Sequence, residues 1–111
     1  MSKSFKDWKL PAKMIKINEI EDDSRVMLFG VVLYKEEETN SILLDDGSGS
    51  VLVRFDFSPE VNVKDFVRVF GTPLIGEKVE IRGEAIQLME NLDFDLYKRA
   101  VEIFKKAMGG N

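Results

Sequence analysis

The chain has 111 residues, a formal net charge of −4 and a sequence pI near 4.9. Its length gives one domain of ordinary size. It contains no cysteine and no histidine, which removes disulfides, thiolate nucleophiles, imidazole bases and the usual zinc ligands. We therefore expect a binding protein rather than an enzyme, with no cofactor and no bound metal.

No apolar stretch approaches the roughly 20 residues that cross a membrane, and the first residues contain no apolar run typical of a secretory signal. We expect no membrane partner. The expected location is intracellular, which means the cytoplasm in a prokaryote or the nucleus in a eukaryote.

Residues 1–12 are predicted to form an N-terminal arm, because Pro11 disfavours a helical conformation at Leu10. Phe5 and Trp8 are its only large apolar side chains. They either lie across the domain as a latch or dock onto a partner, and the latch is favoured because most tryptophans are buried in a core.

Residues 13–90 are predicted to form a barrel domain of five strands. The expected strands are 25–34, 41–46, 50–55, 66–71 and 78–89. Residues 35–40 form a polar loop, residues 58–65 a loop or single helical turn, and residues 72–77 a connection whose tip carries Leu74 and Ile75. Gly47 and Gly49 suit the positive φ of a tight hairpin turn.

Alternation along residues 51–56 assigns Val51, Val53 and Phe55 to the interior. The opposite side then carries Leu52 and Arg54. The neighbouring pair of residues 45–46 is acidic, but it lacks further carboxylates at metal-binding spacing, so a turn is favoured over a metal site.

Residues 91–108 are predicted to form a C-terminal α-helix with apolar residues at coiled-coil spacing. The apolar arc spans about 160°, wider than the stripe of about 100° that one neighbour requires. We expect this helix to assemble the chain with other subunits. The predicted partner-binding residues are Phe94, Tyr97, Ala100, Val101, Phe104 and Met108.

These elements in this order resemble the OB-fold, a small β-barrel that often holds oligonucleotides. Residues 13–108 are similar to the small and middle subunits of replication protein A, the single-stranded-DNA-binding complex of archaea and eukaryotes, and to the small OB subunits of telomere-capping complexes. The resemblance rests on residues 14–20, 26–34, 43–55, 65–71 and 79–84 and on the closing helix. It implies that C-terminal helices of different OB-fold subunits pack into a bundle.

Single-strand sites combine a positive groove with exposed aromatic side chains. The candidate nucleic-acid-binding residues are Tyr34, Lys35, Arg54, Phe57, Arg68, Lys78 and Arg82. The acidic residues 36–38 and 45–46 would repel phosphate near the usual binding face. We therefore expect a subunit of a larger complex that makes weak or auxiliary contact with single-stranded DNA, with RNA as the alternative ligand.

Two other functions remain open. One is an autonomous OB-fold module that binds single-stranded DNA, RNA or tRNA, and the other is a module that contacts only proteins. Salt response separates them, because only phosphate contacts release counterions.

Overall fold

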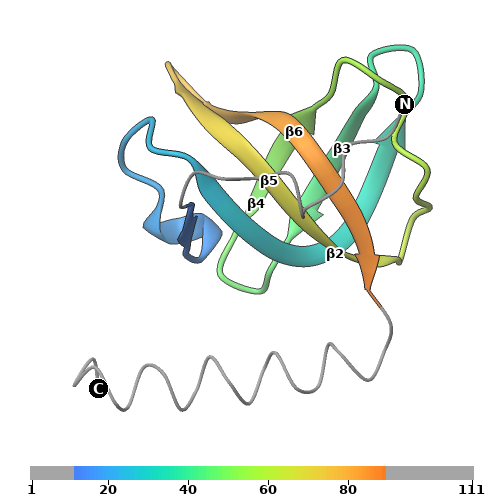
Figure 1. Ribbon diagram of the computed structural model, residues 1–111, viewed down its shortest axis with the longest axis horizontal. Coiled ribbons are helices and arrows are strands. Elements are labelled where there is room, and N and C mark those ends of the chain that lie inside the picture. Colours follow the sequence, from blue (N-terminus) through green and yellow to red (C-terminus); the bar gives the residue numbers. More distant parts are fainter. Residues whose placement is uncertain (1–11, 90–111) are drawn as a thin grey trace.

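The computed structural model describes residues 12–89, which form a mainly β domain (Figure 1). The predicted arm, with Phe5 and Trp8, and the predicted helix 91–108 lie outside the described residues, apart from Ala12. The five long strands are β2 Val26–Glu36, β3 Ser41–Asp45, β4 Ser50–Arg54, β5 Phe66–Ile75 and β6 Val79–Met89. Two short elements, β1 Lys13–Met14 and the 3-10 helix η2 Ile17–Glu19, precede them.

The strands follow the order β1-β2-β3-β4-β6-β5, and β5 pairs again with β2. This second pairing closes a barrel of five strands, since β1 only extends the edge beside the start of β2. Strands β4 and β6 run parallel, whereas the other pairs within the barrel are antiparallel. This topology confirms the predicted OB-fold barrel.

Alternating apolar side chains fill the barrel. Val51, Val53 and Phe55 are buried, as predicted, and Arg54 between them is exposed. The closest packing is at Gly83, where a Cβ atom would lie 2.3 Å from the Phe55 ring. Only glycine fits there, and its absence of a side chain lets the aromatic ring fill the space between β4 and β6.

Strand β5 is longer than predicted. Residues 72–75 were expected to form a connection, but Pro73 pairs with Ile81 and Ile75 pairs with Val79. Pairing with β2 ends at Gly71, so residues 72–75 have only β6 as a strand partner among the described residues. Proline is tolerated there because such an edge needs no second ladder of hydrogen bonds. The hairpin consequently ends at residues 76–78 (Figure 1).

The remaining strand boundaries differ from the predicted ones by no more than two residues. Strand β2 continues two residues beyond the predicted end at Tyr34, because Lys35 and Glu36 pair with β3. Residues 58–65 form a loop, one of the two predicted forms, and Pro59 and Val61 are buried within it.

The turn between β3 and β4 is held by its own acidic side chains. Asp46 Oδ1 accepts hydrogen bonds from the Ser48 backbone N–H at 2.9 Å and from Ser48 Oγ at 2.6 Å. Its other oxygen accepts the Ile17 N–H at 2.7 Å, which ties the turn to η2. Gly47 has a φ of 89°, as the turn prediction requires, whereas Gly49 is not among the residues with positive φ.

Candidate nucleic-acid interface

Strand register places one row of side chains across the outer face of the barrel. Directly paired residues share a face of a sheet, so the row is obtained by following the pairs from β2 through β3, β4 and β6 to β5. Its members are Tyr34, Leu43, Leu52, Glu80 and Leu74. We call this set the outer row.

A second set of paired residues lies beside the outer row, two residues further along β4 and β6. Arg54 pairs with Arg82 across the parallel strands, and Arg82 pairs with Thr72 of β5. Both arginines are exposed. The fold thus brings two of the predicted cationic residues together, although 27 positions separate them in the sequence.

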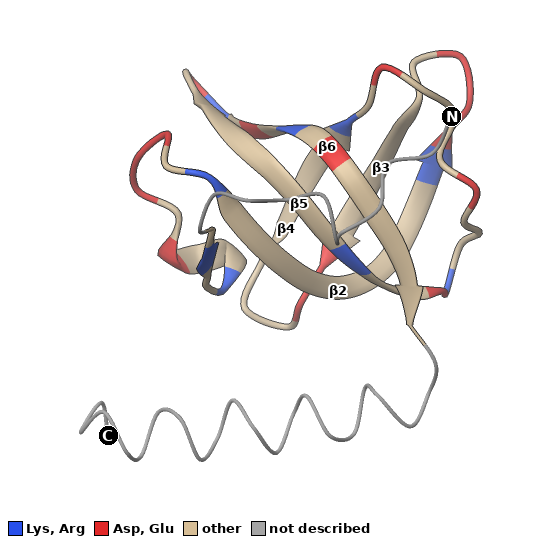
Figure 2. Cartoon of the chain, viewed as in Figure 1, with Lys and Arg blue, Asp and Glu red and all other residues tan. Residues whose placement is uncertain are grey.

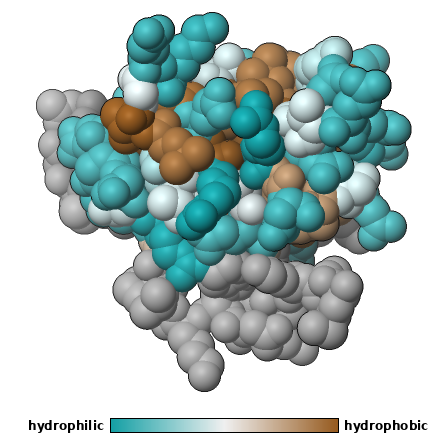
Figure 3. All heavy atoms as spheres, turned by 90° about the horizontal axis from the view of Figure 1, so that it is seen from above, coloured by the Kyte–Doolittle hydropathy of each residue, from teal (hydrophilic) through white to brown (hydrophobic). Residues whose placement is uncertain are grey.

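The two arginines line an open groove of about 500 Å³ at the β5–β6 hairpin. Leu74 forms an apolar part of its wall, and Asp56, Glu80 and Glu84 also line it. Figure 3, which views the molecule from above, shows exposed apolar atoms surrounded by hydrophilic side chains on this side. The groove therefore offers apolar surface together with charges of both signs.

Glu80 is the carboxylate nearest to an arginine of the groove. Its Oε1 lies 3.8 Å from Arg54 Nη1, and both side chains are substantially exposed. An exposed ion pair of this length contributes little to stability. The Arg54 guanidinium can therefore exchange this partner for a ligand at small cost.

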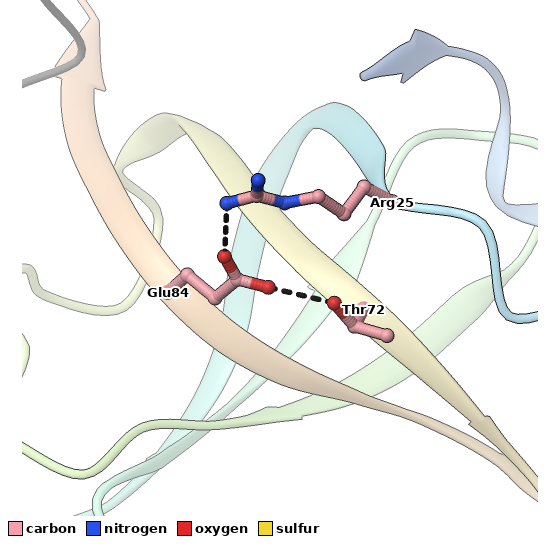
Figure 4. Close-up of polar contacts among 3 residues, drawn as sticks. All are labelled: Arg25, Thr72 and Glu84. Carbon is pink, nitrogen blue, oxygen red and sulfur yellow. Dashed lines mark hydrogen bonds and ion pairs between the residues drawn. The ribbon is translucent and has the colours of Figure 1, made fainter. Parts of the chain in front are cut away.

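Glu84, by contrast, already has partners within the protein. Its carboxylate pairs with Arg25, which precedes β2, and accepts a hydrogen bond from Thr72 Oγ1 at 2.6 Å (Figure 4). Burial alone would raise the pKa of Glu84, but the hydrogen bonds and the positive charges of Arg25 and Arg82 lower it below its usual value. This network joins β6, β5 and the residue before β2 at the wall of the groove.

Tyr34 supplies the aromatic surface of the outer row. Its side chain is 55% exposed, and its hydroxyl donates a hydrogen bond to Glu36 Oε1 at 2.7 Å. That bond and the negative charge of Glu36 raise the pKa of the tyrosine. The ring face remains accessible for stacking on a base.

The other candidate residues do not join the groove. Lys35 Nζ donates to the Val61 carbonyl at 3.0 Å. Phe57 packs on the buried Phe55 ring, with ring centroids 5.0 Å apart. It also lines a separate hollow of about 220 Å³ beside the end of β6.

Arg68 and Lys78 complete the set of candidates. The Arg68 guanidinium lies 6.0 Å from the centre of the Phe29 ring and donates to Gln87, so it packs on β2 and β6 away from the groove. Lys78 is exposed in the turn of the β5–β6 hairpin, two residues before Glu80 of the groove.

Sequence reasoning missed the apolar and hydroxyl members of this face. Leu43, Leu52 and Thr72 sit beside the arginines only because of strand register, and Leu74 was assigned to a hairpin tip rather than to the wall of a groove. Alternation does indicate that Leu52 shares the outer side with Arg54, which was the one available signal.

Acidic residues lie mainly in the connections of the described chain, whereas several basic residues lie on strands (Figure 2). Asp45 and Asp46 are occupied by the turn, where Asp45 Oδ1 accepts the Gly47 N–H at 2.7 Å. Within residues 12–89 no group of three or more acidic residues is placed to hold a metal ion. The same residues contain no helix long and apolar enough to cross a membrane.

No protein-family model matches the chain, and no curated protein matches it. Solved structures do match. The telomere capping protein Ten1 from Saccharomyces pombe has 20% identity and a TM-score of 0.67, covering 86% of this chain and 99% of that one. A chain of the S. pombe Stn1-Ten1 complex has 20% identity and a TM-score of 0.65, covering 89% and 96%.

A chain of a replication protein A heterotrimer bound to single-stranded DNA is similar at 19% identity and a TM-score of 0.59, covering 68% of this chain and 66% of that chain. Identities of this size establish a common fold. The chain therefore has the OB-fold, and in its fold it is similar to Ten1 and to a replication protein A chain.

Proposed function

We propose that this chain is a small OB-fold subunit of a single-stranded-DNA-binding complex like replication protein A, and that its outer barrel face makes weak or auxiliary contact with the strand. The observation that carries the proposal is the pairing of Arg54 with Arg82 beside the outer row that contains Tyr34. A base stacked on an aromatic ring contributes about 1–3 kcal/mol, and guanidinium groups contact the adjacent backbone.

The charge of the chain explains why the contact is weak. A chain with a net charge of −4 lacks the basic footprint of an autonomous binder. Arg54 and Arg82 are the two cations of residues 12–89 that line the groove, so few phosphates are neutralised there. We expect the logarithm of the affinity to fall with the logarithm of salt concentration with a slope near −1.4, about −0.7 for each of two phosphates.

Fluorescence anisotropy with a labelled single-stranded 15-mer tests the contact. Reversing the charge of either arginine, as Arg54→Glu or Arg82→Glu, should weaken binding at least about tenfold and flatten the salt slope. Lys64→Glu is the matched control, because Lys64 is exposed, makes the same change of charge and lines neither hollow. Equal losses in all three variants would contradict a contact centred on the groove.

Assembly through the predicted helix 91–108 is the second part of the proposal. Replacing Tyr97, Val101 and Phe104 together by Ser removes apolar groups from its predicted seam. We expect the unsubstituted chain to self-associate or to bind a larger OB-fold subunit. We expect the triple variant to remain a folded monomer. Light scattering and circular dichroism measure both properties. An unsubstituted chain that is a monomer and does not bind such a subunit would refute assembly through this helix.

A protein-binding module is the second candidate. It is favoured by Leu74 and Ile75, each 52% exposed near the end of the β5–β6 hairpin. Adjacent exposed apolar side chains at a hairpin end suit a protein contact. No salt-dependent binding of any single strand, together with partner binding that is lost in Leu74→Ser, would favour this candidate.

A further inference from the structure

The charges of the groove do not match a track for phosphates. Among the described residues, two guanidinium groups and three carboxylates line it, and Arg25 neutralises one of the carboxylates, Glu84. The exposed Arg54 and Arg82 are therefore balanced by two carboxylates, and the groove has no net positive charge. A groove that follows only the sugar-phosphate backbone is positive along its length. The carboxylates therefore need hydrogen-bond donors in any ligand that fills this space.

The three carboxylates differ in their availability. Glu84 is held by Arg25 and Thr72, and only 17% of its side-chain surface is exposed. Asp56 is exposed, and Glu80 has a single long contact with Arg54 at 3.8 Å. Asp56 and Glu80 are thus the two acceptors that a ligand can reach.

The edge of a nucleobase carries donors and acceptors within a few ångströms. Cytosine presents an exocyclic amino group, which donates hydrogen bonds to Asp or Glu, next to the N3 and O2 acceptors, which suit a guanidinium. Adenine and guanine also carry exocyclic amino groups. Thymine carries no amino group: its edge offers one N3–H donor between the O2 and O4 acceptors, and these oxygens would face the carboxylates. A groove with free carboxylates beside arginines consequently separates these two kinds of base.

We propose that Asp56 and Glu80 are specificity-determining residues that make the groove prefer bases with an exocyclic amino group, so that it binds cytosine strands more tightly than thymine strands. This inference rests on the proposed function and adds a base preference to it. The arginines position the strand, and the carboxylates read the edge of the base.

Anisotropy titrations with labelled dC15, dT15 and dU15 at pH 8 test the preference. We expect dC15 to bind about tenfold more tightly than dT15, and dU15 to bind like dT15. The comparison with deoxyuridine separates the base edge from the methyl group, because uracil has the hydrogen-bonding edge of thymine without its methyl group. If dU15 binds like dC15, exclusion of the methyl group explains the preference and the assignment of the carboxylates is wrong.

The double variant Asp56→Asn, Glu80→Gln should bring the ratio of dC15 to dT15 affinity close to one, because amides donate as well as accept. Glu77→Gln is the control, since Glu77 is an exposed acid of the same hairpin that does not line the groove. It should leave the ratio unchanged, and circular dichroism should show all variants folded.

The outcomes separate the two proposals. Salt-dependent binding of dC15 and dT15 with equal affinity would overturn the base preference and leave the proposed function intact. Tighter binding of dT15 would do the same. No salt-dependent binding of any strand would overturn the proposed function, and the preference with it.

Discussion

Two hairpins of this barrel, β3–β4 and β5–β6, are built in opposite ways. The β3–β4 turn is rich in polar groups, and Asp45 and Asp46 accept hydrogen bonds from the turn itself and from η2. The β5–β6 hairpin ends in Leu74 and Ile75, half-exposed apolar side chains that extend past the last pairing with β2.

The difference separates residues that stabilise the fold from residues left available for a ligand. From the sequence, the acidic side chains were expected to repel phosphate near the binding face. In the structure, those of the β3–β4 turn accept hydrogen bonds from backbone N–H groups. Apolar side chains at the other hairpin have no such use within the described barrel, although Leu74 borders the arginine groove. We expect stability to depend on the first hairpin and binding on the second.

Removing the carboxylate of Asp46 should have the largest effect on stability. Asp46→Ala deletes the acceptor of three hydrogen bonds, one of which holds η2 against the turn. Hydrogen bonds to a charged group contribute about 1.5–3 kcal/mol each without full additivity, so the free energy of unfolding should fall by about 3 kcal/mol. Urea unfolding followed by circular dichroism measures it.

Asp45→Ala is the matched control for this change. Asp45 accepts a hydrogen bond from one backbone N–H of the same turn, so its loss should cost about 1.5 kcal/mol. Equal losses in the two variants would mean that the additional hydrogen bonds of Asp46, including the one to η2, contribute nothing, and the contrast between the hairpins would then weaken.

The base of the β5–β6 hairpin should respond to pH through Glu84. The pKa of Glu84 is lowered in the folded chain, so its contribution is present above the unfolded carboxyl pKa of about 4.3 and is lost as pH falls through the folded pKa. Glu84→Gln should lower the free energy of unfolding by about 1–2 kcal/mol at pH 7. The gap from the parent should close below about pH 4 in urea titrations across pH.

Arg25→Met provides the partner measurement for Glu84. If the ion pair carries the effect, the double variant with Glu84→Gln should lose less than the sum of the two single losses. Strictly additive losses would show that the two side chains act independently, and that the pair in Figure 4 does not fasten the hairpin.

Changes at the end of the β5–β6 hairpin should leave stability nearly intact. Leu74→Ser and Ile75→Ser each alter a side chain that is half-exposed, and surface substitutions of this kind change the free energy of unfolding by about 0.5 kcal/mol or less. Binding of a strand or a protein partner should nevertheless weaken in Leu74→Ser, measured by anisotropy. A large loss of stability would instead show that Leu74 supports the core, and it would contradict the contrast between a stabilising β3–β4 hairpin and a binding β5–β6 hairpin.

Local pattern predicted much of this fold and only part of the site. Alternation identified the strands and the interior residues Val53 and Phe55, because successive side chains of a strand point to opposite faces and the pattern is visible over a few neighbouring residues. It could not show that Arg54 lies beside Arg82, since that depends on the register of two parallel strands joined by a long connection.

Arg68 is a second residue whose surroundings could not be predicted from the local sequence. Like Arg54 it stands between apolar strand residues, and the sequence gives both the same status. Only the neighbours supplied by β2 and β6 distinguish them, because Arg68 packs near the Phe29 ring and bonds Gln87. The predicted length of β5 was wrong for a related reason. A proline at position 73 favours a connection, and only its pairing with Ile81 shows that the strand continues.

The smallest expected effect concerns the hydroxyl of Tyr34. If the ring stacks on a base, Tyr34→Phe keeps the stacking surface and should change strand affinity by less than about twofold, whereas Tyr34→Ala should lose about 1–3 kcal/mol of binding. The hydroxyl itself reports on Glu36, whose charge and hydrogen bond raise the pKa of the tyrosine. Glu36→Gln should therefore lower that pKa, which an ultraviolet titration resolves against Tyr34→Phe as the blank. A Tyr34→Phe variant as weak as Tyr34→Ala would show that the hydroxyl, and not the ring, contacts the strand.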